Sequence, residues 1–291
     1  MNWEGNRESD IVEDRRGGGG GGGFRIGGGS IGIGTVAIAL VASYFFGIDP
    51  GVVLGMLGGG DGQVTQQEQS PARQPPATDE TARFISTVLA DTEDVWSEVF
   101  RAGGANYPKP KLVLFTGRTP TACGTGQSAS GPFYCPGDQR VYIDLGFFRL
   151  MQQRFNVTGE FAQAYVIAHE VGHHVQNVMG IMGKVDGARQ RASEAQANAL
   201  SVRVELQADC FAGVWAKHAN QARNILEAGD IDAALSAATA IGDDALQKQA
   251  QGYVVPDSFT HGSSAQRVRW FKRGIESGQV SACDTFSART L

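Results

Sequence analysis

Residues 165–174 read YVIAHEVGHH, and the interpretation of the whole chain starts from this stretch. His169 and His173 are four residues apart, so on a helix both imidazoles project from one face, about one turn apart. Two zinc ligands supplied by one helix need this arrangement, and Glu170 is placed to reach a water molecule at the same metal. The spacing therefore predicts a helix that carries two ligands of a zinc site.

The apolar residues around the two histidines indicate that this helix is buried. These neighbours are Ala164, Val166, Ile167, Ala168 and Val171. Buried ionisable side chains need a partner, and a metal ion is the simplest partner for two histidines and a glutamate. The alternative is a chance pair of histidines on a helix surface.

A second helical stretch supplies a third ligand, because a catalytic zinc takes three protein ligands and keeps one position open. Glu205 and Asp209 are again four residues apart, within an apolar run. We expect Glu205 to bind the metal and Asp209 to accept the ring N–H of a ligating histidine, which fixes its tautomer and raises its basicity. His218 and His261 compete for the role of third ligand, as does Glu194, which lies farther from the apolar part of the helix.

Helical periodicity dominates the segment from residue 83 to the C-terminus. Apolar residues recur at helical spacing between Phe84 and Phe100. Further helical stretches cover residues 158–179, 188–228, 231–251 and 263–277. Residues 111–115 and 140–144 are short β-branched or aromatic runs that indicate two strands. Few strands and many helices predict an α+β domain over residues 83–291, dominated by helices and containing a small β-sheet.

The chain has four cysteines, which predict disulfide bonds if the domain faces an oxidising compartment. Cys123 and Cys135 bracket one glycine-rich loop, so we expect them to pair. Cys210 and Cys283 would then tie the C-terminal tail to a helix. The sequence does not choose among the possible pairings, and the alternative is buried free thiols. No cysteine has a Cys-x-x-Cys neighbour, so we do not expect them to bind metal.

Glycine content and charge divide the chain into two parts. Of the 40 glycines, 20 lie in the first 62 residues, including an unbroken run at residues 17–23. Residues 1–82 hold 10 acidic and 5 basic residues, whereas residues 83–291 hold 20 of each. The neutral second part lacks the basic face that nucleic-acid binding requires. The glycines have no three-residue period, which excludes collagen, and the 42% hydrophobic content excludes wholesale disorder.

Residues 26–48 are uncharged and mostly apolar, and they predict one transmembrane helix in contact with a lipid bilayer. A helix of this length reaches about 34 Å, enough to cross a hydrocarbon core of about 30 Å. One alternative is a cleaved signal peptide, which the bulky aromatic residues at the end of the run disfavour. The other is a buried core helix.

The flanks of this span predict the organisation of the first 82 residues. Residues 1–25 are polar and glycine-rich, so we expect a disordered tail. Residues 49–82 are rich in Gly, Gln, Pro and Ser, as is typical of a flexible linker. Four arginines precede the span, and Arg73 alone lies in the linker. The positive-inside rule then predicts a cytoplasmic N-terminus and a domain on the far side of the membrane.

Four runs of the sequence carry a resemblance to a known family. They are residues 134–136 (YCP), 142–144 (YID), 169–173 (HEVGH) and 205–209 (ELQAD). In these runs the chain resembles the bacterial neutral zinc metallopeptidases, membrane-anchored proteins of the wider gluzincin group. The resemblance covers most of the chain. It implies a zinc-dependent peptidase with a zincin-like domain, His169, His173 and Glu205 as zinc ligands, and Glu170 as general base. Together with the predicted topology, it leads us to expect single-pass attachment to the bacterial inner membrane and a periplasmic catalytic domain.

A further run, residues 259–270, looks like the His-and-Arg element that follows the second motif in membrane-associated gluzincins. The resemblance implies that His261 donates a hydrogen bond to the developing oxyanion. It also implies that Arg267 supports a carboxylate near the site or the substrate backbone. The alternative is that Ser263 or Ser264 caps a helix and that Arg267 is a surface residue.

Zinc-dependent hydrolysis of a peptide or protein substrate is therefore the function that the sequence predicts. Glu170 would take a proton from the attacking water and pass it to the leaving amine. The rival hypothesis is a non-catalytic envelope-binding or scaffold protein with a retained zinc site. Glu170 argues against it, since a structural site has no use for a general base. A third hypothesis is a zinc hydrolase that acts on a non-peptide amide.

Overall fold

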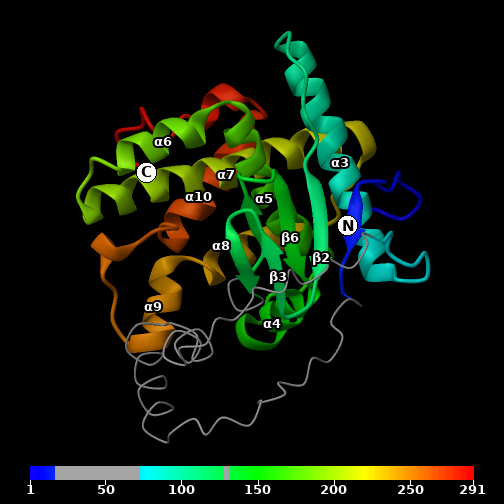
Figure 1. The fold of residues 1–291 in the computed structure, drawn as a ribbon, viewed down its shortest axis with the longest axis horizontal. Helices are drawn as coiled ribbons and strands as arrows, with labels where there is room; N and C mark the ends of the chain where they lie inside the picture. The colour runs from blue at the N-terminus through cyan, green and yellow to red at the C-terminus, as the bar shows by residue number, and fades with distance from the viewer. Residues whose placement is uncertain (17–72, 128–130) are drawn as a thin grey trace, which may run out of the picture. The chain divides into compact units, whose positions relative to one another are not determined.

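A computed structural model of the protein describes residues 1–16, 73–127 and 131–291 (Figure 1). Within them, the strands form a four-stranded sheet and a two-stranded hairpin. The sheet order is β1 (Val12–Asp14), β2 (Lys111–Phe115), β6 (Arg140–Asp144) and β5 (Phe133–Cys135), and the hairpin joins β3 (Arg118–Thr121) to β4 (Gly124–Gln127). Strands β1, β2 and β6 run parallel, and β5 is antiparallel to β6. The two strands predicted from the sequence are β2 and β6, paired side by side.

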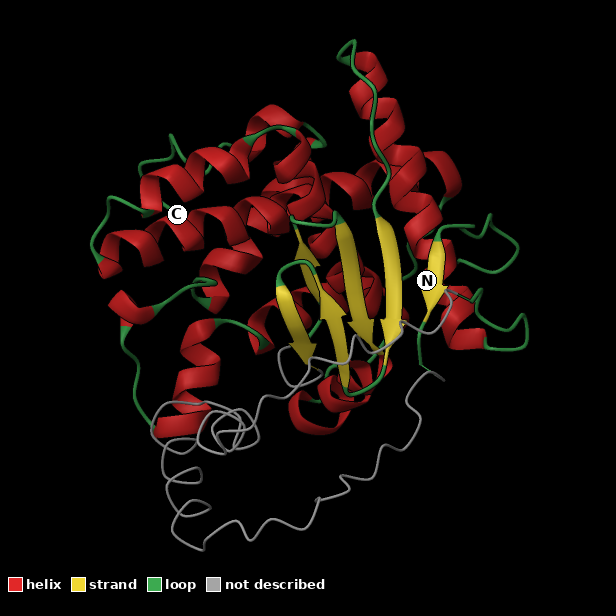
Figure 2. Ribbon diagram, in the orientation of Figure 1, coloured by secondary structure: helices red, strands yellow, loops and turns green. Residues whose placement is uncertain are grey.

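Helices make up most of the rest of the described chain (Figure 2). The α-helices are α3 (Glu80–Ala102), α4 (Leu145–Phe155), α5 (Glu160–Val178), α6 (Ile181–Arg189), α7 (Glu194–Arg223), α8 (Asp230–Ala240), α9 (Asp243–Gln251) and α10 (Ser264–Ser277). In the same described residues, two short 3-10 helices are η2 (Pro256–Ser258) and η3 (Val280–Cys283). The predicted helix-dominated α+β class is confirmed.

One predicted helix, over residues 231–251, is in fact two. Helix α8 ends at Ala240, and the backbone of Gly242 is extended, with φ −69° and ψ 143°. Helix α9 then begins at Asp243, whose carboxylate accepts hydrogen bonds from a loop near the C-terminus of the domain. Helical periodicity does not report such a distant partner.

Local sequence sets the ends of the helices that build the site. Ser193 and Gln196 form a capping box at the start of α7. Ser263 and Gln266 form the same motif at the start of α10, so Ser263 is the capping serine. Asn224 ends α7 in the left-handed conformation, at φ 51°.

Helix α7 packs against both α5 and α10, and α5 also contacts β5 and β6 of the sheet. At the contact with α5, a Cβ atom on Gly172 would lie 3.0 Å from the carbonyl oxygen of Ala208. At the contact with α10, a Cβ atom on Gly274 would lie 2.0 Å from the carbonyl oxygen of Cys210. Glycine at both positions allows close approach of the helix backbones. The histidines of α5 and the carboxylates of α7 can therefore meet between the two helices.

Residues 1–16 form an ordered segment that docks on this fold. Strand β1 pairs with β2 in the main sheet. Trp3 is 5% exposed, and its ring contacts Phe84 of α3 edge to face with a centroid distance of 5.4 Å. Arg7 forms an ion pair of 2.9 Å with Glu93, a buried carboxylate of α3. Apolar burial, strand pairing and an ion pair thus hold this segment to the domain.

The prediction of a disordered tail over residues 1–25 is therefore wrong for residues 1–16. The mostly polar composition of this segment concealed two core residues, Trp3 and Val12, whose partners lie far along the chain. Residues 17–25 lie outside the described residues.

The predicted linker over residues 49–82 also ends earlier than expected. Arg73 forms an antiparallel bridge with Asp14 next to β1. Asp79 caps α3, since its side chain accepts a hydrogen bond from the amide of Ala82. Residues 73–82 therefore belong to the domain, and residues 49–72 lie outside the described part of the chain.

The predicted transmembrane helix over residues 26–48 lies outside the described residues. Within residues 1–16, 73–127 and 131–291, none of the helices combines the length and the hydropathy that a membrane crossing requires. The transmembrane helix and its topology therefore stay predictions.

Candidate metal centre

Two histidines of α5 and one glutamate of α7 converge between these helices. In the described part of the chain, ligand atoms of His169, His173 and Glu205 lie within 4.8 Å of one another. The Nε2 atom of His169 is 3.1 Å from one carboxylate oxygen of Glu205, and that of His173 is 3.5 Å from the other. The three predicted ligands are thus brought together by the fold.

The three side chains differ in their access to water. His169 and His173 are 6% and 8% exposed. The side chain of Glu205 is 18% exposed, so the group lies at a partly open edge of the helix contact. A catalytic ion needs such an opening, because it keeps one position for water or substrate.

Asp209, one turn after Glu205, organises the far side of His169. Its Oδ1 atom is 2.8 Å from Nδ1 of His169 and accepts a hydrogen bond of 2.6 Å from the Tyr165 hydroxyl. Arg267 of α10 donates to both carboxylate oxygens at 2.9 Å. Because the Asp209 carboxylate accepts a hydrogen bond from His169 Nδ1, the other ring nitrogen, Nε2, is the one that faces Glu205 and is left for a metal ion.

Arg267 is 2% exposed, so the alternative of a surface position is wrong. The sequence predicted that Arg267 supports either a carboxylate near the site or the substrate backbone. In the structure it contacts a carboxylate, that of Asp209. Tyr165 was not singled out from the sequence. It lies four residues before His169 on the same helix face, which was the available signal.

The electrostatics of the group favour a bound cation. Burial lowers the pKa of His169, but Asp209 and Glu205 outweigh it and raise that pKa to about 9. Burial raises the pKa of Asp209, yet Arg267 and His169 hold it at about 2. Burial likewise opposes ionisation of Glu205, whose pKa the two histidines hold well below its usual value. The carboxylates therefore stay ionised and retain positive charge between them.

Glu170 lies beside this group on α5 and is 7% exposed. Burial lowers the pKa of His173, but Glu205 and, to a smaller extent, Glu170 raise it above its usual value. The Glu170 charge is therefore close enough to be felt at the second histidine.

His261 lies in the loop before α10, and a carboxylate that the sequence did not reveal holds it. Its Nδ1 is 3.2 Å from Oδ1 of Asp243. The other oxygen of Asp243 accepts from the backbone N–H groups of Thr260, His261 and Gly262 at 2.7, 2.7 and 3.0 Å. With Nδ1 engaged, Nε2 is the nitrogen that a substrate can meet. Sequence offered little signal for Asp243, because acidic residues are common in the first turn of a helix.

The hydrogen bond to Asp243 also raises the pKa of His261. Burial lowers this pKa, and the negative charge of Glu205 raises it further. His261 is therefore within electrostatic reach of the predicted ligands. Its side chain is 52% exposed, which suits contact with a substrate better than metal ligation.

The other candidates for the third ligand lie elsewhere. His218 of α7 contacts the carbonyl oxygen of Gly278 at 2.9 Å, at the end of α10. Glu194 is exposed in the first turn of α7. His174, adjacent to a predicted ligand, is fully buried between the Tyr134 hydroxyl and the Pro108 carbonyl, at 3.0 and 2.5 Å. It supports the loop before β2.

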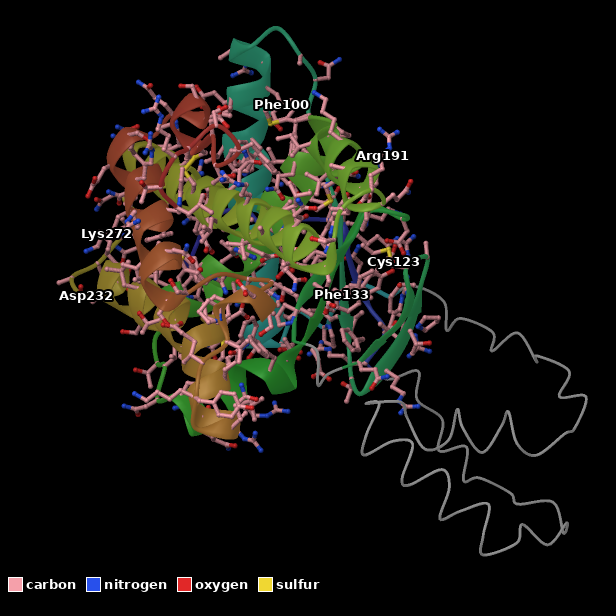
Figure 3. All side chains as sticks on the ribbon, turned by 90° about the vertical axis from the view of Figure 1, so that its left-hand side faces the viewer. Phe100, Cys123, Phe133, Arg191, Asp232 and Lys272 are labelled. Carbon is pink, nitrogen blue, oxygen red and sulfur yellow. A yellow bond between two sulfur atoms is a disulfide. The ribbon has the colours of Figure 1, made fainter. Side chains whose placement is uncertain are left out.

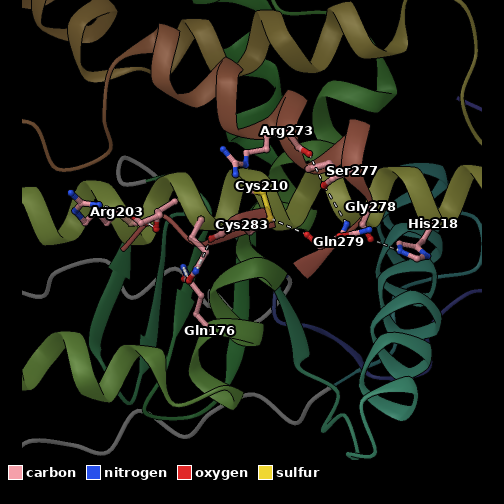
Figure 4. The surroundings of a disulfide bond; sticks show 12 residues. Gln176, Arg203, Cys210, His218, Arg273, Ser277, Gly278, Gln279 and Cys283 are labelled. Carbon is pink, nitrogen blue, oxygen red and sulfur yellow. Dashed lines mark hydrogen bonds between the residues drawn. A yellow bond between two sulfur atoms is a disulfide. The ribbon is translucent and has the colours of Figure 1, made fainter. Parts of the chain in front are cut away.

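Both predicted disulfides are present. Cys123, in the turn of the β3–β4 hairpin, is bonded to Cys135 at the end of β5, with a Cα–Cα distance of 5.8 Å (Figure 3). Cys210 of α7 is bonded to Cys283 of η3, with a Cα–Cα distance of 5.6 Å (Figure 4). The alternative of free thiols is wrong, and the second bond ties the C-terminal segment to α7.

Comparison with known proteins supplies a family for this arrangement. Residues 1–286 match the model of the family described as "Putative neutral zinc metallopeptidase". The chain belongs to this family. Its match to residues 1–286 includes the docked N-terminal segment as well as the metal centre.

Curated relatives in this family come from several bacteria. The Escherichia coli protein named "Uncharacterized protein YpfJ" is 53% identical over 291 residues, which cover 98% of this chain and 99% of the relative. The Mycobacterium tuberculosis protein named "Uncharacterized protein Rv2575" is 41% identical over 219 residues, which cover 72% of this chain and 73% of the relative. No solved structure matches the chain.

The residues present fit the zinc that the family description implies. Two histidine nitrogens and a carboxylate are ligand types that catalytic zinc takes. Each histidine offers Nε2 to the group while its Nδ1 contacts an acceptor, Asp209 for His169 and Gln176 for His173. Such outer contacts are a regular feature of zinc-binding histidines.

Proposed function

We propose that the protein is a zinc-dependent metallopeptidase that hydrolyses peptide bonds. The observation that carries the proposal is the convergence of His169 and His173 on the Glu205 carboxylate, beside Glu170 of the same helix. Membership of the family supports the metal and the reaction class. The partly exposed edge of the group supports access for a substrate.

Zinc held by His169, His173 and Glu205 would supply Lewis-acid chemistry, which lowers the pKa of a water molecule to about 7 and polarises a peptide carbonyl. The Glu170 carboxylate would accept a proton from the attacking water and donate it to the leaving amine. His261, engaged at Nδ1 by Asp243, would donate from Nε2 to the carbonyl oxygen as it gains negative charge.

The proposal is tested by separating metal binding from proton transfer. Glu170→Gln should keep bound zinc and lose hydrolysis of an unfolded protein by about 10²- to 10⁴-fold, because an amide cannot accept the proton. Glu205→Ala should lose both bound zinc and hydrolysis. Zinc content by elemental analysis and the rate with and without a chelator are the two measurements.

Three outcomes would contradict this assignment. Wild-type activity in Glu170→Gln excludes Glu170 as the general base. Unchanged zinc content in Glu205→Ala moves the third ligand elsewhere. A zinc-loaded wild-type chain that leaves unfolded proteins intact points to a non-catalytic role or to a non-peptide amide substrate.

Membrane attachment through residues 26–48 is part of the proposal, with a changed topology. Because β1 pairs with β2, we place residues 1–16 on the same side of the membrane as residues 73–291. The two disulfides favour the oxidising side. Single cysteines at the exposed Lys272 of the domain and at the exposed Glu8 of the N-terminal segment can be labelled in spheroplasts with a thiol reagent that does not cross membranes. Labelling at one end and protection at the other would overturn this placement.

A further inference from the structure

The second ring nitrogen of His173 is held by a neutral amide. Its Nδ1 is 2.9 Å from Oε1 of Gln176, which lies one turn later on α5 and is fully buried. An amide oxygen only accepts hydrogen bonds, so Nδ1 of His173 carries the proton and donates it. Nε2, which faces Glu205 at 3.5 Å, is then the nitrogen whose lone pair is available to a metal ion.

The orientation of the Gln176 amide is itself determined by α7. Its nitrogen donates to the carbonyl oxygen of Val204 at 2.7 Å and to Oε1 of Gln207 at 3.0 Å. Gln207 is 5% exposed, and its own nitrogen donates to the carbonyl oxygen of Cys283 at 2.9 Å. Every donor in the series points the same way, from His173 toward Cys283.

The direction of the last hydrogen bond cannot reverse, because the backbone carbonyl of Cys283 can only accept. A flipped Gln207 amide would place its oxygen against the Cys283 carbonyl and its nitrogen against the nitrogen of Gln176. Both contacts would leave buried polar groups unpaired, at a free-energy cost that the observed orientation avoids. The Val204 carbonyl, through Gln176, and the Cys283 carbonyl, through Gln207, thus together select the amide orientations that keep the proton of His173 on Nδ1.

The position of Cys283 depends on the C-terminal segment (Figure 4). Its disulfide to Cys210 attaches it to α7, one turn from Gln207. Two residues later, the Thr285 hydroxyl donates to the carbonyl oxygen of Arg203 at 2.7 Å, and the Arg203 guanidinium donates back to the carbonyl oxygen of Thr285. The segment is therefore fastened to α7 on both sides of Gln207.

We propose that Gln176 and Gln207 are positioning residues for His173, and that the Cys210–Cys283 disulfide maintains their relay by fixing the Cys283 carbonyl. The inference rests on the proposed zinc site. His169 is held differently, by the ionised carboxylate of Asp209. Zinc affinity then depends, through His173, on a disulfide that contributes no ligand.

The relay is tested with zinc-loaded, full-length protein and a competing chelator. Gln176→Leu should weaken zinc binding by about 10- to 100-fold, the usual effect of losing an outer partner of a metal ligand. Gln207→Glu keeps the shape and the acceptor but cannot donate to the Cys283 carbonyl, so it should also weaken binding. Gln221→Leu, at an exposed glutamine of the same helix, is the matched control and should leave zinc affinity unchanged.

The disulfide has an internal control in the other bond of the domain. The double variant Cys210→Ser/Cys283→Ser should lower zinc affinity, whereas Cys123→Ser/Cys135→Ser should not, because Cys123 and Cys135 lie in the β3–β4 turn and at the end of β5, outside the series from His173 to Cys283. Imidazole ¹⁵N spectra provide a readout besides affinity. The Nδ1 proton of His173 should be seen in the wild type and should exchange faster with water in Gln207→Glu.

The outcomes separate this inference from the proposed function. A wild-type chain that binds no zinc overturns both. If the wild type binds zinc and the zinc affinities of Gln176→Leu and Gln207→Glu lie within about twofold of it, the relay alone is overturned. If the Cys210→Ser/Cys283→Ser variant does not fold, the Gln207→Glu measurement decides, since that variant retains both disulfides.

Discussion

Replacing Arg267 with Met tests how the domain supports its metal centre. Arg267 is 2% exposed and donates two hydrogen bonds of 2.9 Å to Asp209, which is fully buried. The variant keeps most of the side-chain volume but leaves the Asp209 carboxylate without the Arg267 guanidinium. His169 and Tyr165 would remain as its donors.

Breaking a buried ion pair by removing one partner typically costs about 3–5 kcal/mol. For a domain of this size, 1 kcal/mol shifts the melting temperature by about 2–4 °C, so the expected loss is about 6–20 °C. The double variant Arg267→Met/Asp209→Asn should recover part of it, because the buried carboxylate that loses its guanidinium partner is removed as well. Lys272→Met, at an exposed position of the same helix, should have little effect (Figure 3).

Thermal unfolding of chelator-treated protein measures this effect without a contribution from zinc binding. The reasoning is refuted if the free energies of unfolding of Arg267→Met and Lys272→Met differ by less than about 1 kcal/mol, since an exposed ion pair contributes no more than that. It is also refuted if the double variant is no more stable than the single one. Zinc content of the untreated variants then shows whether the Asp209 contact with His169 survives.

Three further predictions concern other parts of the domain. Asp243→Asn should slow hydrolysis by about 10-fold or more at unchanged zinc content, because His261 loses its carboxylate partner; equal rates would exclude this pairing. Trp3→Ala should destabilise the protein by about 3–5 kcal/mol in urea unfolding, and a negligible loss would mean that the N-terminal segment is not docked. Metal-free protein should lose stability as pH rises from about 6.5 to about 9, because the folded state favours the protonated form of His169, whose pKa is raised to about 9. If the difference in unfolding free energy between the wild type and His169→Gln does not change with pH, this prediction is wrong.

The ligand set could be predicted because its spacing is a property of single helices. His169 and His173 share a face of α5 wherever that helix packs, and Glu205 and Asp209 share a face of α7 in the same way. The apolar residues around both pairs showed that these faces are buried. That the two pairs meet depends on the close approach at Gly172, which the sequence did not reveal.

Other contacts had no local signature. Asp243 binds a loop 17 to 19 residues away, and Gln207 donates to a carbonyl 76 residues away. Composition also misjudged residues 1–16, because Trp3 and Val12 become core residues only when α3 and β2 are present to cover them. Average polarity cannot report burial that a distant element provides.

The sequence by itself determined the helix-dominated α+β class, the two strands β2 and β6, and the residues that converge as candidate metal ligands. It did so because periodicity and i, i+4 spacing are local properties of the chain. Only the tertiary structure decided that β1 joins the sheet, that Asp243 holds His261, and that a relay of buried amides links His173 to the C-terminal disulfide. These features depend on hydrogen bonds between distant segments, and such bonds form only after the helices and strands have packed.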